Sequence, residues 1–218
     1  MSVYPTLSPA RQWLATEAGR PFTWQAFPPL DAGRGIFVGD PLSRPDTLNK
    51  ITLPADVTSL TPWVFEAGEE TEAFYAHTNS LIWLEVSGTK PAFTVLMAEF
   101  SIDAACIGVF PAAAYDALGA LDRVDDGPSA FDWVSDHLPQ IAHFACTLPI
   151  PQSETPCFIA STGSDGGYAA AALLDVEGSL SGVLIDIAGR ASDSRFIDKL
   201  LPAPPTRPLR RGRSAGVT

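Results

Sequence analysis

The sequence has very few basic residues through most of its length. Between Ile51 and Gly189 the only basic residues are Lys90 and Arg123, against 19 acidic ones. Over the whole chain, 14 Lys and Arg are set against 25 Asp and Glu, which gives a formal net charge of -11. Nucleic-acid binding needs a basic footprint that neutralises phosphates. This composition therefore argues against a nucleic-acid ligand and favours a basic protein partner.

Long hydrophobic runs and paired cysteines are also missing. No stretch of about 18 apolar residues occurs, so we expect no membrane span. The N-terminus has no basic start followed by an apolar core, so we expect no secretory signal. The three cysteines, Cys106, Cys146 and Cys157, are an odd number in a chain of 218 residues, which favours free thiols over a disulfide framework. We therefore expect a soluble, cytoplasmic protein.

The rest of the composition is ordinary for a folded protein. Hydrophobic residues make up 46% and charged residues 18% of the chain, which is enough for one substantial core at this length. We expect a single globular domain over residues 1–203. Residues 204–218 combine proline with four arginines and lack apolar periodicity, a pattern typical of an extended, mobile end.

Short apolar segments at close spacing predict an α+β fold made mainly of antiparallel sheet. Runs rich in aromatic and β-branched residues follow one another between Thr61 and Phe110, and this spacing favours a meander or sandwich over βαβ units. Three short helices are expected, over residues 8–17, 111–124 and 128–148. In the last, Phe131, Val134 and Leu138 would form one buried stripe, and Pro139 would kink or end the helix.

The C-terminal part predicts three strands joined by two turns rich in Gly and Asp. The strands are expected over 156–162, 167–174 and 179–187, with turns at 163–167 and 175–179. Both turns have the composition of hairpin loops in which φ is positive, so we predict a meander. A phosphate-binding loop would need a helix after the glycines, and no Lys-Ser or Lys-Thr follows them.

Three short motifs occur in order along the chain. They are FVGDPL at 37–42, SIDAACIGVF at 101–110, and TGSDGGY…LLDVEG…LIDI from Thr162 to Ile187. Together they resemble a bacterial family named domain of unknown function 4241. The resemblance implies a β-rich bacterial domain of a kind linked to toxin–immunity systems. Ala105 stands where the family has glycine and Ile187 where it has an aromatic residue, so a site shaped by those positions would be altered here.

Two tryptophans beside acidic runs are candidate anchors for a partner protein. Trp63 precedes Glu66, Glu69, Glu70 and Glu72, and Trp133 lies among Asp122, Asp125, Asp126, Asp132 and Asp136. The alternative for both tryptophans is burial as large core residues. If exposed, an aromatic side chain ringed by carboxylates would suit a partner with a basic groove.

The resemblance motifs also contain four carboxylates, Asp40, Asp103, Asp165 and Asp186. If they converge, they form an alternative ligand site that binds a divalent cation or acts as an acid–base pair. As turn residues, Asp40 and Asp165 would instead accept hydrogen bonds from nearby backbone. No set of His and Cys has the spacing of four metal ligands, so we expect no metal and no cofactor.

The sequence therefore favours a non-enzymatic acidic interaction protein. We expect an immunity or antidote protein that neutralises a basic toxin by protein–protein binding, and no catalytic motif argues for an enzyme. Two alternatives stay open. One is a small-ligand or metal-binding domain, enzymatic or not, built on the turns with Asp40, Asp165 and Asp186. The other is a structural accessory subunit with no site of its own.

Overall fold

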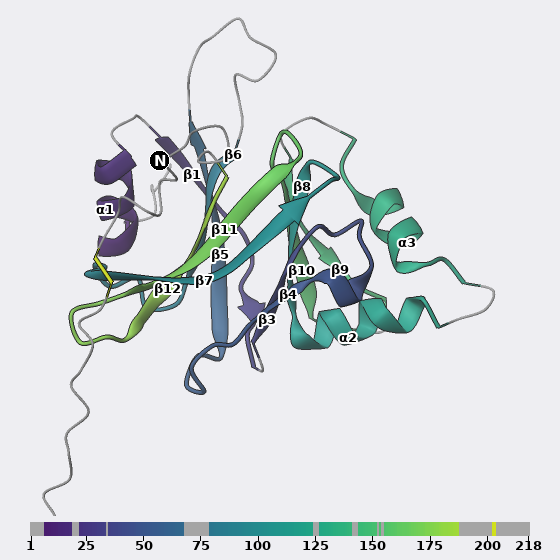
Figure 1. Ribbon diagram of the computed structural model, residues 1–218, viewed down its shortest axis with the longest axis horizontal. Coiled ribbons are helices and arrows are strands. Elements are labelled where there is room, and N and C mark those ends of the chain that lie inside the picture. Colours follow the sequence, from purple (N-terminus) through teal and green to yellow (C-terminus); the bar gives the residue numbers. More distant parts are fainter. Residues whose placement is uncertain are drawn as a thin grey trace, which may run out of the picture.

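The chain folds into four layers, in which two antiparallel sheets lie between helices (Figure 1). The computed structural model describes residues 7–18, 22–33, 35–67, 79–123, 127–140, 144–151, 153, 155–187 and 202–203. Every pair between the named strands is antiparallel. The predicted α+β fold with mainly antiparallel sheet is therefore confirmed. The predicted tail, residues 204–218, lies outside the described residues.

The larger sheet has seven strands in the order β1-β5-β6-β12-β11-β7, with β2 paired to β5. The strands are β1 (Phe22–Ala26), β2 (Leu30–Asp31), β5 (Ser59–Ala67), β6 (Asn79–Glu85), β7 (Phe93–Ile102), β11 (Gly166–Leu174) and β12 (Leu180–Asp186). At its centre, Gly182 of β12 lies against Trp83 of β6, and a Cβ at Gly182 would collide with the indole ring. Glycine is therefore required there for the indole to lie flat on the sheet.

The smaller sheet has five strands in the order β4-β3-β8-β10-β9. The strands are β3 (Ile36–Gly39), β4 (Asn49–Ile51), β8 (Cys106–Pro111), β9 (Ala145–Pro149) and β10 (Pro156–Ser161), and a 3-10 helix η1 (Pro45–Thr47) lies between β3 and β4. Strand β9 corrects the helix predicted over 128–148, which is wrong beyond His137. Helix α3 (Ala130–His137) stops before Pro139, as the missing proline N–H requires, and Ala145–Pro149 pairs with β10 instead.

The glycine-rich segment 163–167 joins the two sheets. Strand β10 before it belongs to the five-stranded sheet, and β11 after it belongs to the seven-stranded sheet. The predicted turn is confirmed, with φ of 72° at Gly163, but the predicted hairpin is wrong because turn composition fixes backbone angles and not strand partners. The second turn does close a hairpin, β11–β12, in which Asp175 accepts the N–H of Ser179 at 2.8 Å.

Strand β11 is buried on both faces, which explains its run of alanines. Ala170 and Ala172 lie in the core between the two sheets, while Ala169 and Ala171 lie on the face covered by helix α1 (Pro9–Ala18). Small side chains let both neighbouring layers approach the strand. Pairing with β7 and β12 overrides the high helix propensity of alanine.

The helices cover the outer faces of the two sheets (Figure 1). Helix α1 packs on the larger sheet through Ala10 and Leu14. Helices α2 (Ala112–Leu121) and α3 pack on the smaller sheet. No helix among the described residues is long and apolar enough to cross a membrane.

Candidate functional site

Asp40, the first of the candidate ligand carboxylates, holds two loops together. It follows β3 and is 5% exposed. Its Oδ1 accepts the N–H of Leu42 at 2.9 Å, and its Oδ2 accepts the N–H groups of Asp103 and Ala104 at 2.7 and 2.9 Å. With both oxygens accepting backbone N–H groups, Asp40 joins the turn after β3 to the turn between β7 and β8. The structure thus gives this carboxylate the role of a turn residue.

Asp103 bonds Asp40 through its backbone N–H, and Asp165 lies on the turn next to that of Asp103. Gly166 pairs with Ile102 across β11 and β7, which brings the turns that carry Asp103 and Asp165 side by side. Both of these side chains are exposed.

Asp186 lies within β12, opposite Ala169 of β11 and Leu81 of β6, and is 3% exposed. The four carboxylates of the alternative site therefore do not converge. Across the described part of the chain, no group of three or more His, Cys, Asp or Glu is placed to hold a metal ion.

Trp63, the first candidate anchor, is buried beneath helix α1 and is 8% exposed. The guanidinium of Arg11 lies over its ring, and Nε of Arg11 donates to Oε2 of Glu85 at 3.1 Å. The same Glu85 oxygen accepts hydrogen bonds from the Ser8 hydroxyl and the Trp83 indole. The indole of Trp63 is therefore part of the packing of α1. Residues 69, 70 and 72 and the side chain of Glu66 lie outside the described residues.

Trp133, the second candidate anchor, is also buried, and its neighbour Phe131 is the exposed aromatic residue of α3. Trp133 is 7% exposed and stacks on His137 with ring centroids 4.5 Å apart. Phe131 is 52% exposed, so its predicted place on the buried stripe is wrong. The buried positions are 130, 133 and 134, which follow helical spacing and leave 131 on the open side. In the sequence, Ser129 marks the start of the helix, and the helical spacing counted from it is the signal that places Phe131 on the exposed face.

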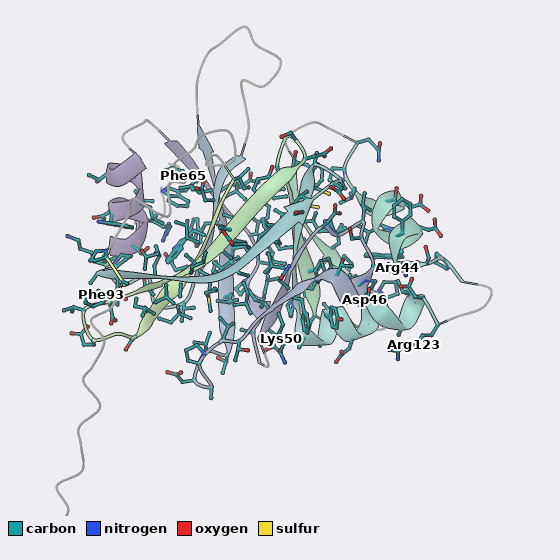
Figure 2. The ribbon with its side chains drawn as sticks, viewed as in Figure 1. Arg44, Asp46, Lys50, Phe65, Phe93 and Arg123 are labelled. Carbon is teal, nitrogen blue, oxygen red and sulfur yellow. The ribbon has the colours of Figure 1, made fainter. Side chains whose placement is uncertain are left out.

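Phe131 borders a groove that runs between η1 and the helices α2 and α3. The groove has a volume of about 790 Å³. Its polar and aromatic lining includes Arg44, Asp46, Tyr115, Asp116, Asp122 and Arg123. Figure 2 shows Arg44, Asp46 and Arg123 on the side of the molecule formed by α2 and α3. The groove thus carries charges of both signs next to an exposed aromatic ring.

The walls of this groove are held by local hydrogen bonds and stacking. Oδ1 of Asp122 accepts the N–H of Ala130 at 2.7 Å, which fixes the start of α3 against the end of α2. Asp132 and Ser129 form a capping box at the same helix start. The ring of Tyr115 stacks on Phe37 of β3 with centroids 3.7 Å apart. These contacts place the groove on rigid elements.

Two carboxylates of the groove lining are left for a ligand. Asp46 and Asp116 are exposed and have no hydrogen-bond or ion-pair partner in the described ranges. Asp136 is also exposed and without such a partner there, but it lies on α3 outside the groove lining. The predicted partner-binding residues Asp125 and Asp126 lie outside those ranges.

The three cysteines are free and lie on neighbouring strands β8, β9 and β10. Burial raises the pKa of the Cys106 and Cys157 thiols to about 12 and that of Cys146 to about 11. A thiol acts as a nucleophile or metal ligand only as the thiolate. These cysteines therefore serve as packing residues at neutral pH.

Comparisons with known proteins give no match: no protein-family model matches the chain, and no curated protein and no solved structure is similar to it. The resemblance to the family named domain of unknown function 4241 stays a prediction.

Proposed function

We propose that this chain is a non-enzymatic binding protein whose groove beside α2 and α3 docks a basic segment of a partner protein. The observation that carries the proposal is Phe131, a side chain 52% exposed at the rim of a groove of about 790 Å³. Aromatic residues are enriched in the centres of protein interfaces. An aromatic side chain left exposed on a short, well-anchored helix is therefore suited to meet a partner.

The charges around Phe131 favour a basic partner. Asp46, Asp116 and Asp122 line the groove together with Arg44 and Arg123, and Asp132 and Asp136 lie on the adjoining helix α3. An excess of negative charge attracts a cationic segment over long range and speeds its association. At contact, an arginine of the partner would stack on the Phe131 ring and pair with the free carboxylate of Asp116.

A nuclease toxin has the required chemistry. Its substrate groove is basic because it binds phosphates, and carboxylates presented along a helix take the place of those phosphates. Binding there blocks the substrate and makes this chain an immunity or antidote protein. Electrostatic attraction brings the partner to this surface, and Phe131, not Trp133, makes the aromatic contact.

A pull-down with charge-matched variants tests this proposal. Tagged full-length protein is incubated with its native lysate at low and high salt, and retained proteins are identified by mass spectrometry. The groove variant combines Asp116→Lys with Phe131→Ala. The control variant combines Asp56→Lys with Val176→Ala, which makes the same change of charge at two exposed positions outside the groove lining.

We expect one basic partner that the wild type and the control variant retain at low salt, that high salt releases, and that the groove variant does not retain. With the purified partner, Phe131→Ala alone should weaken Kd by roughly 30-fold, the effect of losing about 2 kcal/mol at an interface hot spot. Equal retention by the groove and control variants, or no partner at either salt, overturns the proposal.

A small anionic ligand is the second candidate, because two cations line the same groove. Arg44 and Arg123 are two of the few basic residues between 35 and 187, and the groove volume is typical of ligand sites. A ligand site in this groove replaces the alternative site at Asp40, Asp165 and Asp186, because Asp186 lies within β12, apart from the turns that carry the other two. A thermal-shift screen of phosphate and carboxylate compounds tests it. A rise in Tm that is lost in Arg44→Ala and Arg123→Ala, and kept in Phe131→Ala, favours this ligand over a protein partner.

A further inference from the structure

The wall that α2 contributes to the groove has a glycine at its centre. The lining residues on this wall belong to α2 or to the two positions that follow it, and they are Tyr115, Asp116, Gly119, Asp122 and Arg123. Residues three or four apart lie next to one another on a helix surface, so these five form one face with Gly119 in the middle. The middle of the wall therefore carries no side chain.

Nothing in the described part of the chain requires glycine at position 119. Its φ is not positive, and apart from the helix backbone around it, a Cβ built there would have no atom of the described residues within 4 Å. At Gly108 and Gly182, by contrast, a Cβ would collide with aromatic rings. Glycine in a helix interior is less stable than alanine. Gly119 therefore weakens α2 without improving the packing of the described residues.

A glycine at this position lets another molecule approach the helix closely. Without a Cβ, an outside group can lie directly on the backbone. Gly119 is half-buried and opens onto the groove of about 790 Å³. The space next to Gly119 is therefore suited to hold a side chain of a partner.

Carboxylates lie on both sides of that space. Asp116 is three residues before Gly119 and Asp122 three residues after it, which sets them about 9 Å apart along the helix axis. Asp116 has no hydrogen-bond or ion-pair partner in the described ranges. Asp122 accepts the N–H of Ala130 through Oδ1, and its Oδ2 has no partner among the described residues. Both carboxylates can therefore accept hydrogen bonds from a ligand.

The chemistry of this position favours an arginine over a lysine. A guanidinium is planar and carries five N–H donors in a fork, so it can donate to two carboxylates at once, whereas an ammonium is a compact point charge. The exposed ring of Phe131 at the rim offers an aromatic face to the same planar cation. The described lining contains three carboxylates and two arginines, so one added guanidinium balances its charge.

We propose that the groove takes up a single arginine side chain of the partner, which lies across Gly119 with its guanidinium between Asp116 and Asp122. This contact rests on the proposed function and names the residue that the partner's basic segment presents. A side chain at position 119 would occupy the space of that arginine. Binding is thus the reason for a glycine that packing within the described chain does not require.

Two capped tripeptides probe this contact without the partner. Acetyl-Ala-Arg-Ala-amide and acetyl-Ala-Lys-Ala-amide are each titrated at low salt into the isotope-labelled full-length protein, and the backbone amide resonances are followed by NMR. We expect the arginine peptide to shift the resonances of residues 116–122 to saturation. It should bind roughly five-fold more tightly than the lysine peptide, a difference of about 1 kcal/mol.

Substitutions at position 119 separate binding from stability. Gly119→Leu fills the space and should lose the shifts. Ala113→Leu is the matched control and should keep them, because Ala113 is exposed on the same helix outside the groove lining. Gly119→Ala should raise Tm by roughly 2–4 °C and still weaken the binding of the arginine peptide. A glycine with only a structural role would not give this combination.

The peptides and the pull-down distinguish this contact from the proposed function as a whole. In the pull-down we expect Ala113→Leu to retain the basic partner and Gly119→Leu to lose it. Equal affinities for the two peptides, no saturable shift with the arginine peptide, or binding that survives Gly119→Leu overturns the arginine contact. A partner that Gly119→Leu retains, but that the variant with Asp116→Lys and Phe131→Ala does not, overturns the contact and leaves the proposed function standing.

Discussion

The guanidinium of Arg11 lies over the indole of Trp63, with Cζ of the arginine 3.6 Å from the ring centroid. Both residues are nearly inaccessible to solvent, and Glu85 holds the same guanidinium through Nε. The pair links helix α1 to strand β5 of the larger sheet. It also explains why a tryptophan next to an acidic run is a packing residue and not a docking residue.

Arg11→Ala should strongly destabilise the fold. The side chains of Arg11 and Glu85 are 6% and 15% exposed, so the variant leaves a carboxylate that is largely buried without its cation, at a cost of roughly 3 kcal/mol. Urea denaturation measures the loss in the free energy of unfolding. Arg44→Ala is the control, because Arg44 is exposed and its loss should change stability by no more than about 0.5 kcal/mol.

The double variant Arg11→Met, Glu85→Gln separates the buried charge from the packing. It should recover most of the stability lost in Arg11→Ala, because no unpaired charge is left beneath α1. Similar midpoints for Arg11→Ala and Arg44→Ala would show that the ion pair does not hold α1 in place.

Asp40→Asn should destabilise the fold, whereas Asp165→Asn should not. The Asp40 carboxylate accepts three backbone N–H groups from two segments, and an amide would turn its NH₂ toward at least one of these donors. The expected loss is about 2 kcal/mol, since hydrogen bonds to charged groups are the stronger class. Asp165 is exposed and serves as the control. Equal urea midpoints for the two variants would contradict the structural role of Asp40.

Local signals in the sequence predicted the elements well, and strand partners poorly. Pro139 marks the end of α3, and the Gly and Asp residues mark both C-terminal turns, because proline and glycine act through their own backbone angles. Which strands those turns connect depends on pairing with distant segments. The composition of residues 163–167 therefore predicts a hairpin turn, whereas in the structure this segment connects a strand of one sheet to a strand of the other.

Of the charged residues that line the groove, the sequence analysis named only Asp122 as a partner-binding residue. Arg44 and Asp46 come from η1, far from residues 122–136 in the sequence, and only the fold brings them to the same groove. Which aromatic side chain stands beside this groove depends on the rotation of one short helix. A helix of eight residues offers only two turns of periodicity, which is too little to fix its buried face from the sequence. Trp133, considered as an exposed anchor, is therefore buried, and Phe131, predicted on the buried stripe, is exposed.

The buried thiols should make the fold less stable as pH rises above about 9. Burial raises the pKa of Cys106 and Cys157 from about 9 to about 12, so below pH 9 both thiols are protonated in the folded and the unfolded chain. Between these values only the unfolded chain loses its protons, and stability falls by up to about 1.4 kcal/mol per pH unit for each thiol. Urea midpoints measured from pH 8 to 10.5 test this dependence.

Cys157→Ala is the variant that isolates the effect of one thiol. Its stability at pH 8 should be lower because a buried sulfur is removed, but its loss per pH unit should be smaller than that of the wild type. A pH dependence identical to that of the wild type would show that the Cys157 thiol does not remain protonated in the folded chain.

Ala105→Gly should stabilise the fold, although it replaces a side chain with none. Ala105 has φ of 49°, the left-handed region, which costs a residue with a Cβ roughly 1 kcal/mol. Its backbone is held there because its carbonyl accepts the N–H of Thr162 at 2.8 Å. Glycine removes the strain but loses more conformational freedom on folding, so we expect a net gain of about 0.5 kcal/mol and a rise in Tm of about 1–2 °C. Ala104→Gly is the matched control, because Ala104 is not in the left-handed region, and this variant should lower Tm. If both variants lower Tm to the same extent, the backbone at Ala105 is not strained.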